Sequence, residues 1–288
     1  MSIRTEHLTA KYHPGTPMET LAVDDVNIEI HEGEFTGLIG HTGSGKSTLI
    51  QHLNGLLKPY SGRVLFNDQD IHSDGYSLRS LRGHVGLVFQ YPEHQLFEEN
   101  VLTDVCFGPK NLGLSEDEAK ERAASALEYV GIGSDFFEKS PFDLSGGQKR
   151  RVAIAGVLAM EPEYLILDEP TAGLDPEGRD EILNGLDSIR SEKGTTIILV
   201  THSMDDVARH CGRVIAMDHG RVRFDGPVKE VFSHRAELEA MGLSVPQAAS
   251  VGEALRAAGF SIPSDAITVD AVRLAILKQL GTGEGARE

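Results

Sequence analysis

Glycines, a lysine and several hydroxyl side chains crowd into one short segment of the chain. This segment reads Gly40-His41-Thr42-Gly43-Ser44-Gly45-Lys46-Ser47-Thr48. Glycine-rich turns let several backbone N–H groups converge on a phosphate, and the start of a following helix adds positive potential. Lys46 can then reach the terminal phosphate oxygens, and the Ser47 hydroxyl can coordinate Mg²⁺. The segment therefore predicts a phosphate loop, because a glycine turn without a ligand gives the lysine and the serine no role.

Two adjacent carboxylates, Asp168 and Glu169, end an apolar run at residues 164–167 and are followed by Pro170. An acidic pair at a strand end is commonly a solvated turn, but a phosphate loop in the same chain favours metal binding and catalysis. Adjacent residues of a strand point to opposite sides. We therefore expect the two carboxylates to have different roles.

Two further polar residues follow apolar runs, which is where strand ends are expected. Gln90 follows residues 85–89, and His202 follows residues 196–200. A histidine in this position is usually an ordinary surface residue, and of the 12 histidines only His202 has a supporting motif, while none lies in a metal-type spacing. Tyr12 lies near the start of the chain, where it either packs or stacks on a planar ligand.

A second helix start with free N–H groups is predicted within Leu144-Ser145-Gly146-Gly147-Gln148. Ser145 can cap a helix whose apolar residues continue to Leu158, and the two glycines leave its first N–H groups uncovered. This makes a second anion site. Since the chain already has a phosphate loop, the second site needs another nucleotide to act on.

The elements around these residues are predicted from periodicity and turn signals. Extended segments at 3–12 and 22–30 fit antiparallel strands, and 34–39, 164–167, 196–200 and 213–217 alternate with helices as a parallel sheet requires. A helix is expected over 46–57 and another over 115–130, where Ser115 and Glu118 have capping-box spacing. Asp218-His219-Gly220 predicts a final hairpin turn. We therefore expect an α/β fold with a P-loop core.

The phosphate loop, the segment 144–148 and the strand-end acidic pair, in this order, resemble the nucleotide-binding subunits of ABC-type ATPases. The resemblance implies a P-loop NTPase core with a parallel sheet, an antiparallel edge subdomain and an α-helical subdomain. It also implies that Asp168 orients Mg²⁺ and Glu169 polarises the attacking water. Gln90 would touch Mg²⁺ and sense the γ-phosphate, His202 would contact the γ-phosphate, and Tyr12 would stack on adenine. The implied ligands are ATP and Mg²⁺.

The same resemblance implies a dimer. In this family the segment 144–148, the signature, acts on ATP held by the opposite subunit, so that two nucleotides are sandwiched between two chains. Residues 172–176 resemble the D-loop, which would place Asp175 along the dimer seam. Because the sequence holds one set of motifs, the functional unit is expected to be a homodimer or a heterodimer with a similar chain.

Three segments, 12–17, 91–101 and 107–113, resemble the ATPases of energy-coupling factor transporters, which import vitamins and cobalt or nickel. This implies an ATP-hydrolysing motor subunit, peripheral to the cytoplasmic face of the cell membrane. A helix beginning around Gln95 would line a groove for a transmembrane coupling subunit. This subunit would dock near Tyr91–Val101. Without it, Leu96, Phe97 and Val101 would be exposed apolar side chains without a function. A separate membrane subunit would select the substrate. The stretches 14–17 and 93–94 favour the second of two ATPase types and therefore a heterodimer.

Composition agrees with a protein that docks on a protein partner. The formal net charge of -17 argues against a nucleic-acid surface and against direct adsorption to an anionic membrane. The N-terminus lacks the apolar core of a secretion signal and no run is long enough to span a bilayer, so we expect a cytoplasmic chain. The two cysteines, Cys106 and Cys211, are expected to be reduced and structural.

The chain is expected to divide into a nucleotide-binding domain over 1–232, with its helical subdomain at about 91–160, and a helical appendage over 233–280, followed by a disordered tail over 281–288. The family counterpart of the appendage helps hold two ATPase subunits together, and the alternative is an accessory that only covers the main domain. Three rival functions remain at this stage. They are a soluble ABC ATPase acting on DNA or ribosomes, an ATP-binding regulator that does not hydrolyse, and the ATPase of an exporter or of a binding-protein-dependent importer.

Overall fold

Two sheets form the body of the protein in the computed structural model, which describes residues 1–283. The four-stranded sheet has the order β2-β1-β4-β5, and the six-stranded sheet has the order β10-β9-β3-β8-β7-β6. The strands are β1 (Ser2–Tyr12), β2 (Thr20–His31), β3 (Phe35–Ile39), β4 (Ser61–Phe66), β5 (Gln69–Asp70), β6 (Val85–Val88), β7 (Tyr164–Asp168), β8 (Thr196–Val200), β9 (Arg213–Asp218) and β10 (Arg221–Pro227).

The six-stranded sheet is the parallel core that the sequence predicts. Strands β3, β7 and β8 are buried at every residue, because helices cover both faces of a parallel sheet. Only β10 runs antiparallel to its neighbour, β9, and the two are joined by the predicted hairpin turn, where His219 and Gly220 both have positive φ. The phosphate loop leaves the end of β3, in the middle of this sheet.

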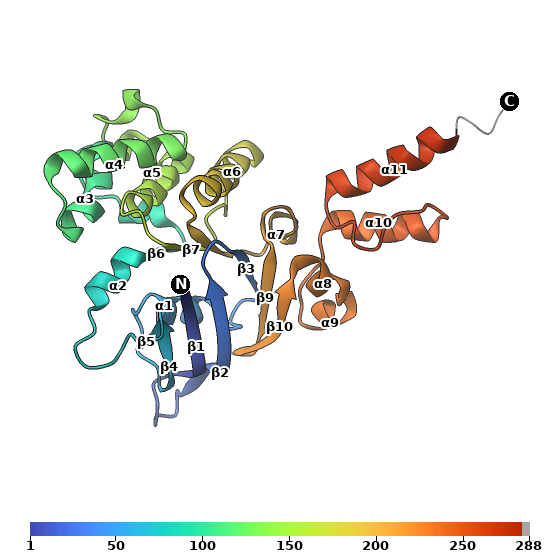
Figure 1. Ribbon diagram of the computed structural model, residues 1–288, viewed down its shortest axis with the longest axis horizontal. Helices are drawn as coiled ribbons and strands as arrows, with labels where there is room; N and C mark the ends of the chain where they lie inside the picture. The colour runs from blue at the N-terminus through green and yellow to red at the C-terminus, as the bar shows by residue number, and fades with distance from the viewer. Residues whose placement is uncertain (284–288) are drawn as a thin grey trace.

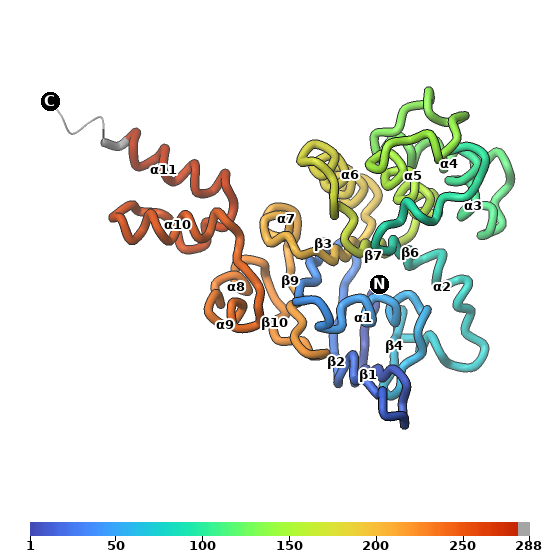
Figure 2. The backbone as a smooth tube through the Cα atoms, turned by 180° about the vertical axis from the view of Figure 1, so that it is seen from behind, coloured from blue at the N-terminus to red at the C-terminus, as the bar shows by residue number. Residues whose placement is uncertain are grey.

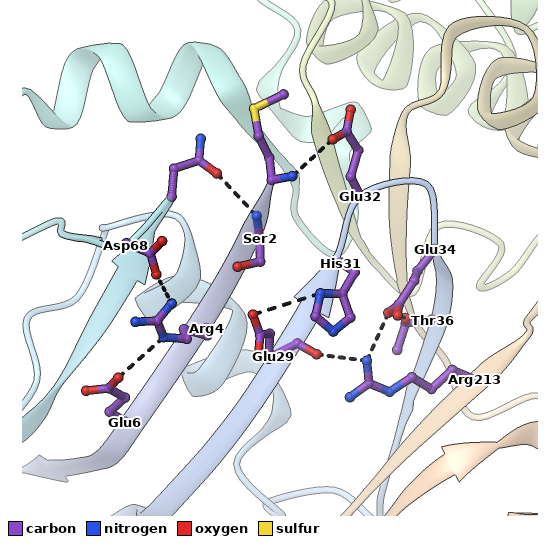
Figure 3. Close-up of polar contacts among 12 residues, drawn as sticks. Ser2, Arg4, Glu6, Glu29, His31, Glu32, Glu34, Thr36, Asp68 and Arg213 are labelled. Carbon is purple, nitrogen blue, oxygen red and sulfur yellow. Dashed lines mark hydrogen bonds and ion pairs between the residues drawn. The ribbon is translucent and has the colours of Figure 1, made fainter.

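The antiparallel sheet is confirmed as a separate layer beside the core. Residues of β1 alternate between buried and less buried positions over most of its length, so one face of the strand packs and the other meets solvent. Arg213, at the start of β9, joins the two sheets. Its Nη1 atom donates to the backbone oxygen of Glu29 at 2.8 Å and to Glu34 Oε2 at 2.9 Å, as Figure 3 shows.

The helical subdomain is formed by α3, α4 and α5 and lies at one end of the six-stranded sheet, over β6 and β7 (Figure 1). The capping box of Ser115 and Glu118 is present at the start of α4, and the apolar face predicted for this helix is buried. The helices that come before and within this region are α1 (Lys46–Leu53), α2 (Leu78–His84), α3 (Val101–Leu112), α4 (Glu116–Tyr129) and α5 (Gly146–Leu158), with 3-10 turns at Pro92–Gln95, Ser134–Phe136 and Pro141–Asp143.

Helix α1 ends four residues earlier than the sequence pattern predicts. It stops at Leu53 rather than at Leu57, because Asn54 leaves helical geometry and Gly55 adopts a φ of +69°. A Cβ atom on Gly55 would also lie 2.8 Å from Leu78 Cδ2. A glycine in the left-handed region ends a helix at little cost. The prediction of a helix to Leu57 rested on apolar periodicity alone and ignored Gly55.

The remaining helices are α6 (Pro176–Lys193), α7 (Met204–His210), α8 (Val228–Ser233), α9 (Arg235–Ala240), α10 (Gln247–Ala257) and α11 (Val269–Gly283). Phe232, Leu238 and Leu243 belong to the main core, whereas α10 and α11 share a small cluster of their own around Ile262 and Val272. The helices α10 and α11 extend away from the body, which is visible from both sides (Figures 1 and 2).

The predicted disordered tail over 281–288 is partly corrected. Residues 281–283 belong to α11, and residues 284–288 lie outside the described residues. The helix keeps Leu274, Leu277 and Leu280 between 55% and 60% exposed. Over residues 1–283, none of the helices combines the length and the apolar character that crossing a bilayer requires.

Candidate nucleotide site

One pocket of about 420 Å³ brings together residues from six separate parts of the sequence. It lies where the phosphate loop, the ends of β6, β7 and β8 and the end of β1 meet. Its lining includes these predicted site residues: Tyr12, Thr42, Gly43, Gly45, Lys46, Ser47, Thr48, Gln90, Asp168, Glu169 and His202. The sequence did not predict that Thr20, Leu21 and Ala22 also line it.

The start of α1 leaves its first N–H groups without a side-chain cap. Gly45 is the N-cap residue, has a φ of +103° and offers no side chain, and the first turn holds no acidic residue. A Cβ atom on Gly45 would lie 2.4 Å from the backbone oxygen of Ala22, so only glycine fits here. Uncapped helix starts bind anions through their N–H groups and the positive end of the helix dipole. The loop therefore has the form that phosphate binding needs.

Lys46 is buried within the phosphate loop. Its Nζ atom donates to the backbone oxygens of Gly40, at 2.6 Å, and His41, at 3.0 Å. Burial lowers the pKa of Lys46 from its ordinary value, and the nearby carboxylates Glu169 and Asp168 oppose that effect. The ammonium group is thus held at the base of the pocket, where a phosphate would give it a charged partner.

Ser47 and Asp168 are directly hydrogen-bonded, with the Ser47 hydroxyl donating to Asp168 Oδ2 at 3.0 Å. Burial raises the pKa of Asp168, and the hydrogen bond from Ser47 acts against this shift. Gln90 lines the same pocket with its neutral amide. A hydroxyl, a carboxylate and an amide are hard oxygen donors of the kind that Mg²⁺ prefers, so the donor set fits this ion.

Glu169 occupies a special backbone conformation. It follows the last residue of β7, its φ is +52°, and its N–H donates to the backbone oxygen of Val200 at 2.9 Å. Strand alternation, from which different roles were predicted for the two carboxylates, therefore does not apply to Glu169. Because the chain turns at Glu169 instead of continuing the strand, Asp168 and Glu169 both line the same pocket.

Most of the Glu169 side chain is buried, and its carboxyl group can exchange a proton near neutral pH. Burial, followed by the charge of Asp168, raises the pKa of Glu169 to about 7. Its Oε1 atom is buried without a hydrogen-bond partner and lies 3.3 Å from His202 Nε2. Burial and then Lys46 lower the pKa of His202, which favours its neutral form. A carboxyl group with a pKa near neutrality and an unpaired oxygen has the properties of a general base.

Tyr12 lies at the rim of this pocket and is 42% exposed. Its hydroxyl group is hydrogen-bonded to Thr48 Oγ1 at 3.1 Å, so the ring is fixed beside the start of α1. Gly40, His41 and Ser44 do not line the pocket. Gly40 and Ser44 are buried within the loop, and the ring of His41 lies against Asp218.

The signature forms a different pocket, of about 360 Å³, together with the D-loop. Ser145 caps α5 by accepting from the Gln148 N–H at 3.3 Å, and Gln148 Oε1 accepts from the Ser145 N–H at 2.9 Å. Asp175 caps α6 through a hydrogen bond from the Gly178 N–H. The helix predicted after Ser145 is confirmed. Its pocket shares no lining residue with the phosphate-loop pocket.

Arg150 links the signature helix to both neighbouring loops, and sequence reasoning missed it. Its side chain is almost fully buried and makes two hydrogen bonds to Glu93, at 3.0 and 2.7 Å. It also donates to the backbone oxygen of Ala172, in the D-loop. A buried arginine that is hydrogen-bonded to two segments couples their positions. The available signal was an arginine on the apolar face of a predicted helix.

The segment after Gln90 is built differently from expectation. A helix does not begin around Gln95, because Pro92–Gln95 is a 3-10 turn and α3 begins at Val101, where the Asn100 side chain caps it. Asp104 Oδ2 accepts from the N–H groups of Phe97, at 2.8 Å, and Glu98, at 2.9 Å, and holds the intervening loop.

The apolar side chains of this segment divide between core and surface. Leu96 and Val101 are buried, contrary to the prediction that they are exposed, whereas Phe97 is 55% exposed and packs edge to face on Phe107 at 5.0 Å. Phe97 and Phe107 line a mostly apolar groove of about 540 Å³ between α3 and α5, which also includes Arg79.

Comparison with known proteins gives a consistent picture. The profile of the family described as ABC transporter matches residues 23–172. The chain is 53% identical over 280 residues to the energy-coupling factor transporter ATP-binding protein EcfA2 of Caldanaerobacter subterraneus subsp. tengcongensis, covering 97% of this chain and 98% of the relative. It is 54% identical over 279 residues to the EcfA2 protein of Clostridium tetani, covering 96% and 97%.

A solved structure is similar as well. The protein cbiO1 of Clostridium perfringens, described as part of the ABC transporter complex cbiONQ, superposes with a TM-score of 0.74 and 43% sequence identity. The match covers 88% of this chain and 98% of that one.

Proposed function

This chain belongs to the ABC transporter family, among the ATP-binding proteins of energy-coupling factor transporters, and we propose that it is the ATP-hydrolysing motor of an importer for a vitamin or a transition-metal ion. The observation that carries the proposal is the meeting of Lys46, Asp168 and Glu169 in one pocket at the phosphate loop. An ABC ATPase binds ATP. This pocket has the Lys46 ammonium group for the phosphates, oxygen donors for Mg²⁺ and Glu169 as a candidate general base.

The residues of the pocket divide the work of hydrolysis. The N–H groups of the phosphate loop and Lys46 bind the phosphates, and Tyr12 stacks on the adenine. Ser47, Asp168 and Gln90 hold Mg²⁺, which when bound neutralises phosphate charge. Glu169 accepts a proton from the water that attacks the γ-phosphate, and His202, 3.3 Å from the Glu169 carboxylate, contacts that phosphate.

The complete active unit contains two ATPase chains. The signature pocket lies apart from the phosphate-loop pocket of its own chain, and its helix start is open to a ligand from outside. We infer that it contacts ATP bound by a partner ATPase, with Asp175 along the seam, and that the partner is a related chain rather than an identical copy. ATP then favours closure of the pair, and loss of the γ-phosphate reopens it.

The groove at Phe97 and Phe107 is the proposed contact with a transmembrane coupling subunit. Its exposed aromatic side chains suit an apolar helix of a partner, and it borders the segment Tyr91–Val101. Arg150 connects Glu93, in this segment, with the D-loop, so movement at the groove reaches the dimer seam. A substrate-binding membrane subunit joins indirectly, and the chain acts at the cytoplasmic face of the cell membrane.

The test is purification of the tagged chain from its native cell after mild detergent extraction of the membranes. We expect a second ATPase, a coupling subunit and small substrate-binding membrane proteins to purify with it. A Phe97→Ala variant is expected to lose the membrane subunits and keep the second ATPase. Recovery of the wild-type chain without membrane partners, with ATP hydrolysis intact, would overturn the transport role and favour a soluble ABC ATPase.

A further inference from the structure

A cluster of two histidines and one aspartate lies at the outer side of the phosphate loop. His41 belongs to the loop, Asp218 ends β9, and His219 starts the β9–β10 turn. One potential ligand atom of each residue lies within 4.8 Å of the others. None of the three lines the nucleotide pocket, and the proposed ATP and Mg²⁺ chemistry does not use their side chains.

The hydrogen bonds of His41 leave a requirement for a positive charge. Its Nδ1 atom lies 2.8 Å from the backbone oxygen of Thr42, which can only accept, so Nδ1 carries a hydrogen. Its Nε2 atom lies 3.2 Å from Asp218 Oδ1. In a neutral ring this Nε2 presents a lone pair to a carboxylate oxygen, which is repulsive. Either a proton or a metal ion is therefore needed between Nε2 and Oδ1.

A second imidazole approaches the same carboxylate oxygen. His219 Nε2 lies 3.6 Å from Asp218 Oδ1, and the rings of His41 and His219 are 5.1 Å apart, edge to face. A single proton on His41 would not account for the approach of His219 to Asp218 Oδ1. One ion bound by two imidazoles and a carboxylate satisfies all three side chains.

We propose that His41, Asp218 and His219 form a site for a divalent late first-row transition-metal ion, such as Zn²⁺, outside the nucleotide pocket. Two imidazoles and one carboxylate are a ligand set typical of Zn²⁺ and its neighbours, whereas Mg²⁺ prefers oxygen ligands. The bond from His41 Nδ1 to a backbone oxygen is the supporting contact that metal-binding histidines usually have. Water completes the coordination at the side of His219, whose side chain is 81% exposed.

Such an ion would clamp the phosphate loop to the β9–β10 turn. The two segments already touch, since the Gly220 N–H donates to the backbone oxygen of Ser44 at 3.0 Å. The His41 backbone oxygen also accepts from Lys46. The metal would thus fix the loop from outside the nucleotide pocket. The competing cation is Arg223, whose Nε lies 3.5 Å from the other Asp218 oxygen.

The test is a Zn²⁺ titration of the full chain, free of any polyhistidine tag, without nucleotide and in competition with a chromophoric chelator. We expect one equivalent of Zn²⁺ to bind, with a higher Tm on binding, and Mg²⁺ not to compete. The variant His219→Asn removes a ligand and keeps a residue that tolerates the φ of +48° at this position. It should weaken Zn²⁺ binding by at least about tenfold, the lower bound for loss of a supporting partner in a metal site.

Two further variants make the result specific to this cluster. Asp218→Asn should weaken Zn²⁺ binding like His219→Asn. The matched control is His7→Asn, which removes an exposed histidine that pairs with Asp25 at 2.7 Å, lies outside the cluster and has a similar φ of +50°, and it should bind Zn²⁺ like the wild type. Equal Zn²⁺ affinity in the wild type and both cluster variants would overturn the proposal.

Discussion

The phosphate-loop pocket and the signature pocket both lie at the start of a helix, yet the two helix starts are built in opposite ways. Helix α1 begins at Gly45 without a side-chain cap, whereas α5 begins with a reciprocal capping box between Ser145 and Gln148. A capped helix start is stable by itself, and an uncapped one needs an external acceptor for its N–H groups. The first site therefore depends on a bound phosphate, while the second is a stable surface that can be presented to one.

The two pockets also differ in charged groups that can do chemistry. The phosphate-loop pocket holds a lysine and two carboxylates with shifted pKa values, Lys46, Asp168 and Glu169. In the signature pocket, Arg151 pairs with Glu181, and Asp175 caps α6. Perturbed pKa values concentrate where catalysis occurs. The chemistry is therefore expected to reside in the phosphate-loop pocket and its completion in the signature pocket, and four experiments test this division.

The largest expected effect comes from Glu169→Gln, which keeps the shape of the side chain and removes the base. Turnover should fall by about 10² to 10⁴, the range for a lost general base, while ATP binding survives. Phosphate release measures turnover, and binding of a fluorescent ATP analogue measures affinity. Unchanged turnover would remove Glu169 from the chemistry and the division of labour with it.

The next largest effect is expected from Ser145→Ala in the second pocket. Turnover of the assembled ATPase should fall by about 10², as for one lost donor to a developing charge, without a change in ATP affinity of this chain. Loss of the cap costs about 1 kcal/mol of stability, which a denaturant titration measures separately. The matched control is Ser115→Ala, which removes the capping box of α4, lines neither pocket and should cost similar stability with full turnover.

The pH dependence of turnover should follow the phosphate-loop pocket alone. Since burial raises the pKa of Glu169 to about 7 and the base must be ionised, turnover should fall about tenfold per pH unit below 7 and level off above it. The folded state binds this proton more tightly than the unfolded state, so Glu169 lowers stability as pH rises from its ordinary pKa of 4.5 through 7. The Tm gain of Glu169→Gln over the wild type should therefore be larger at pH 8 than at pH 5. A gain independent of pH would contradict the raised pKa.

The smallest effect is expected from Tyr12→Ala, at the rim of the first pocket. Loss of stacking should weaken ATP binding about 5- to 10-fold, the low end of the range for such contacts, because the ring is 42% exposed. Tyr12→Phe is the control, since it keeps the ring and removes only the hydrogen bond to Thr48. Equal affinity in the wild type and Tyr12→Ala would mean that the ring only packs.

Features that depend on neighbouring residues could be predicted from the sequence. The phosphate loop, the caps at Ser115 and Ser145 and the turn at His219 each arise within a few residues, where backbone geometry follows directly from residue type. The fully apolar runs of β7 and β8 likewise specify a sheet covered on both faces. These local rules gave the α/β core and most of the nucleotide-site residues.

The contacts between distant residues could not be predicted in this way, because they depend on tertiary packing. The turn at Glu169 that brings both carboxylates into one pocket depends on a hydrogen bond to Val200, and Arg150 joins two loops through contacts that no spacing shows. His41 and Asp218 are 177 residues apart and meet because β3 and β9 are neighbours in the sheet. A linear pattern records the period of each element, whereas pairing between elements depends on the packing of the whole core, and these meetings follow from that packing.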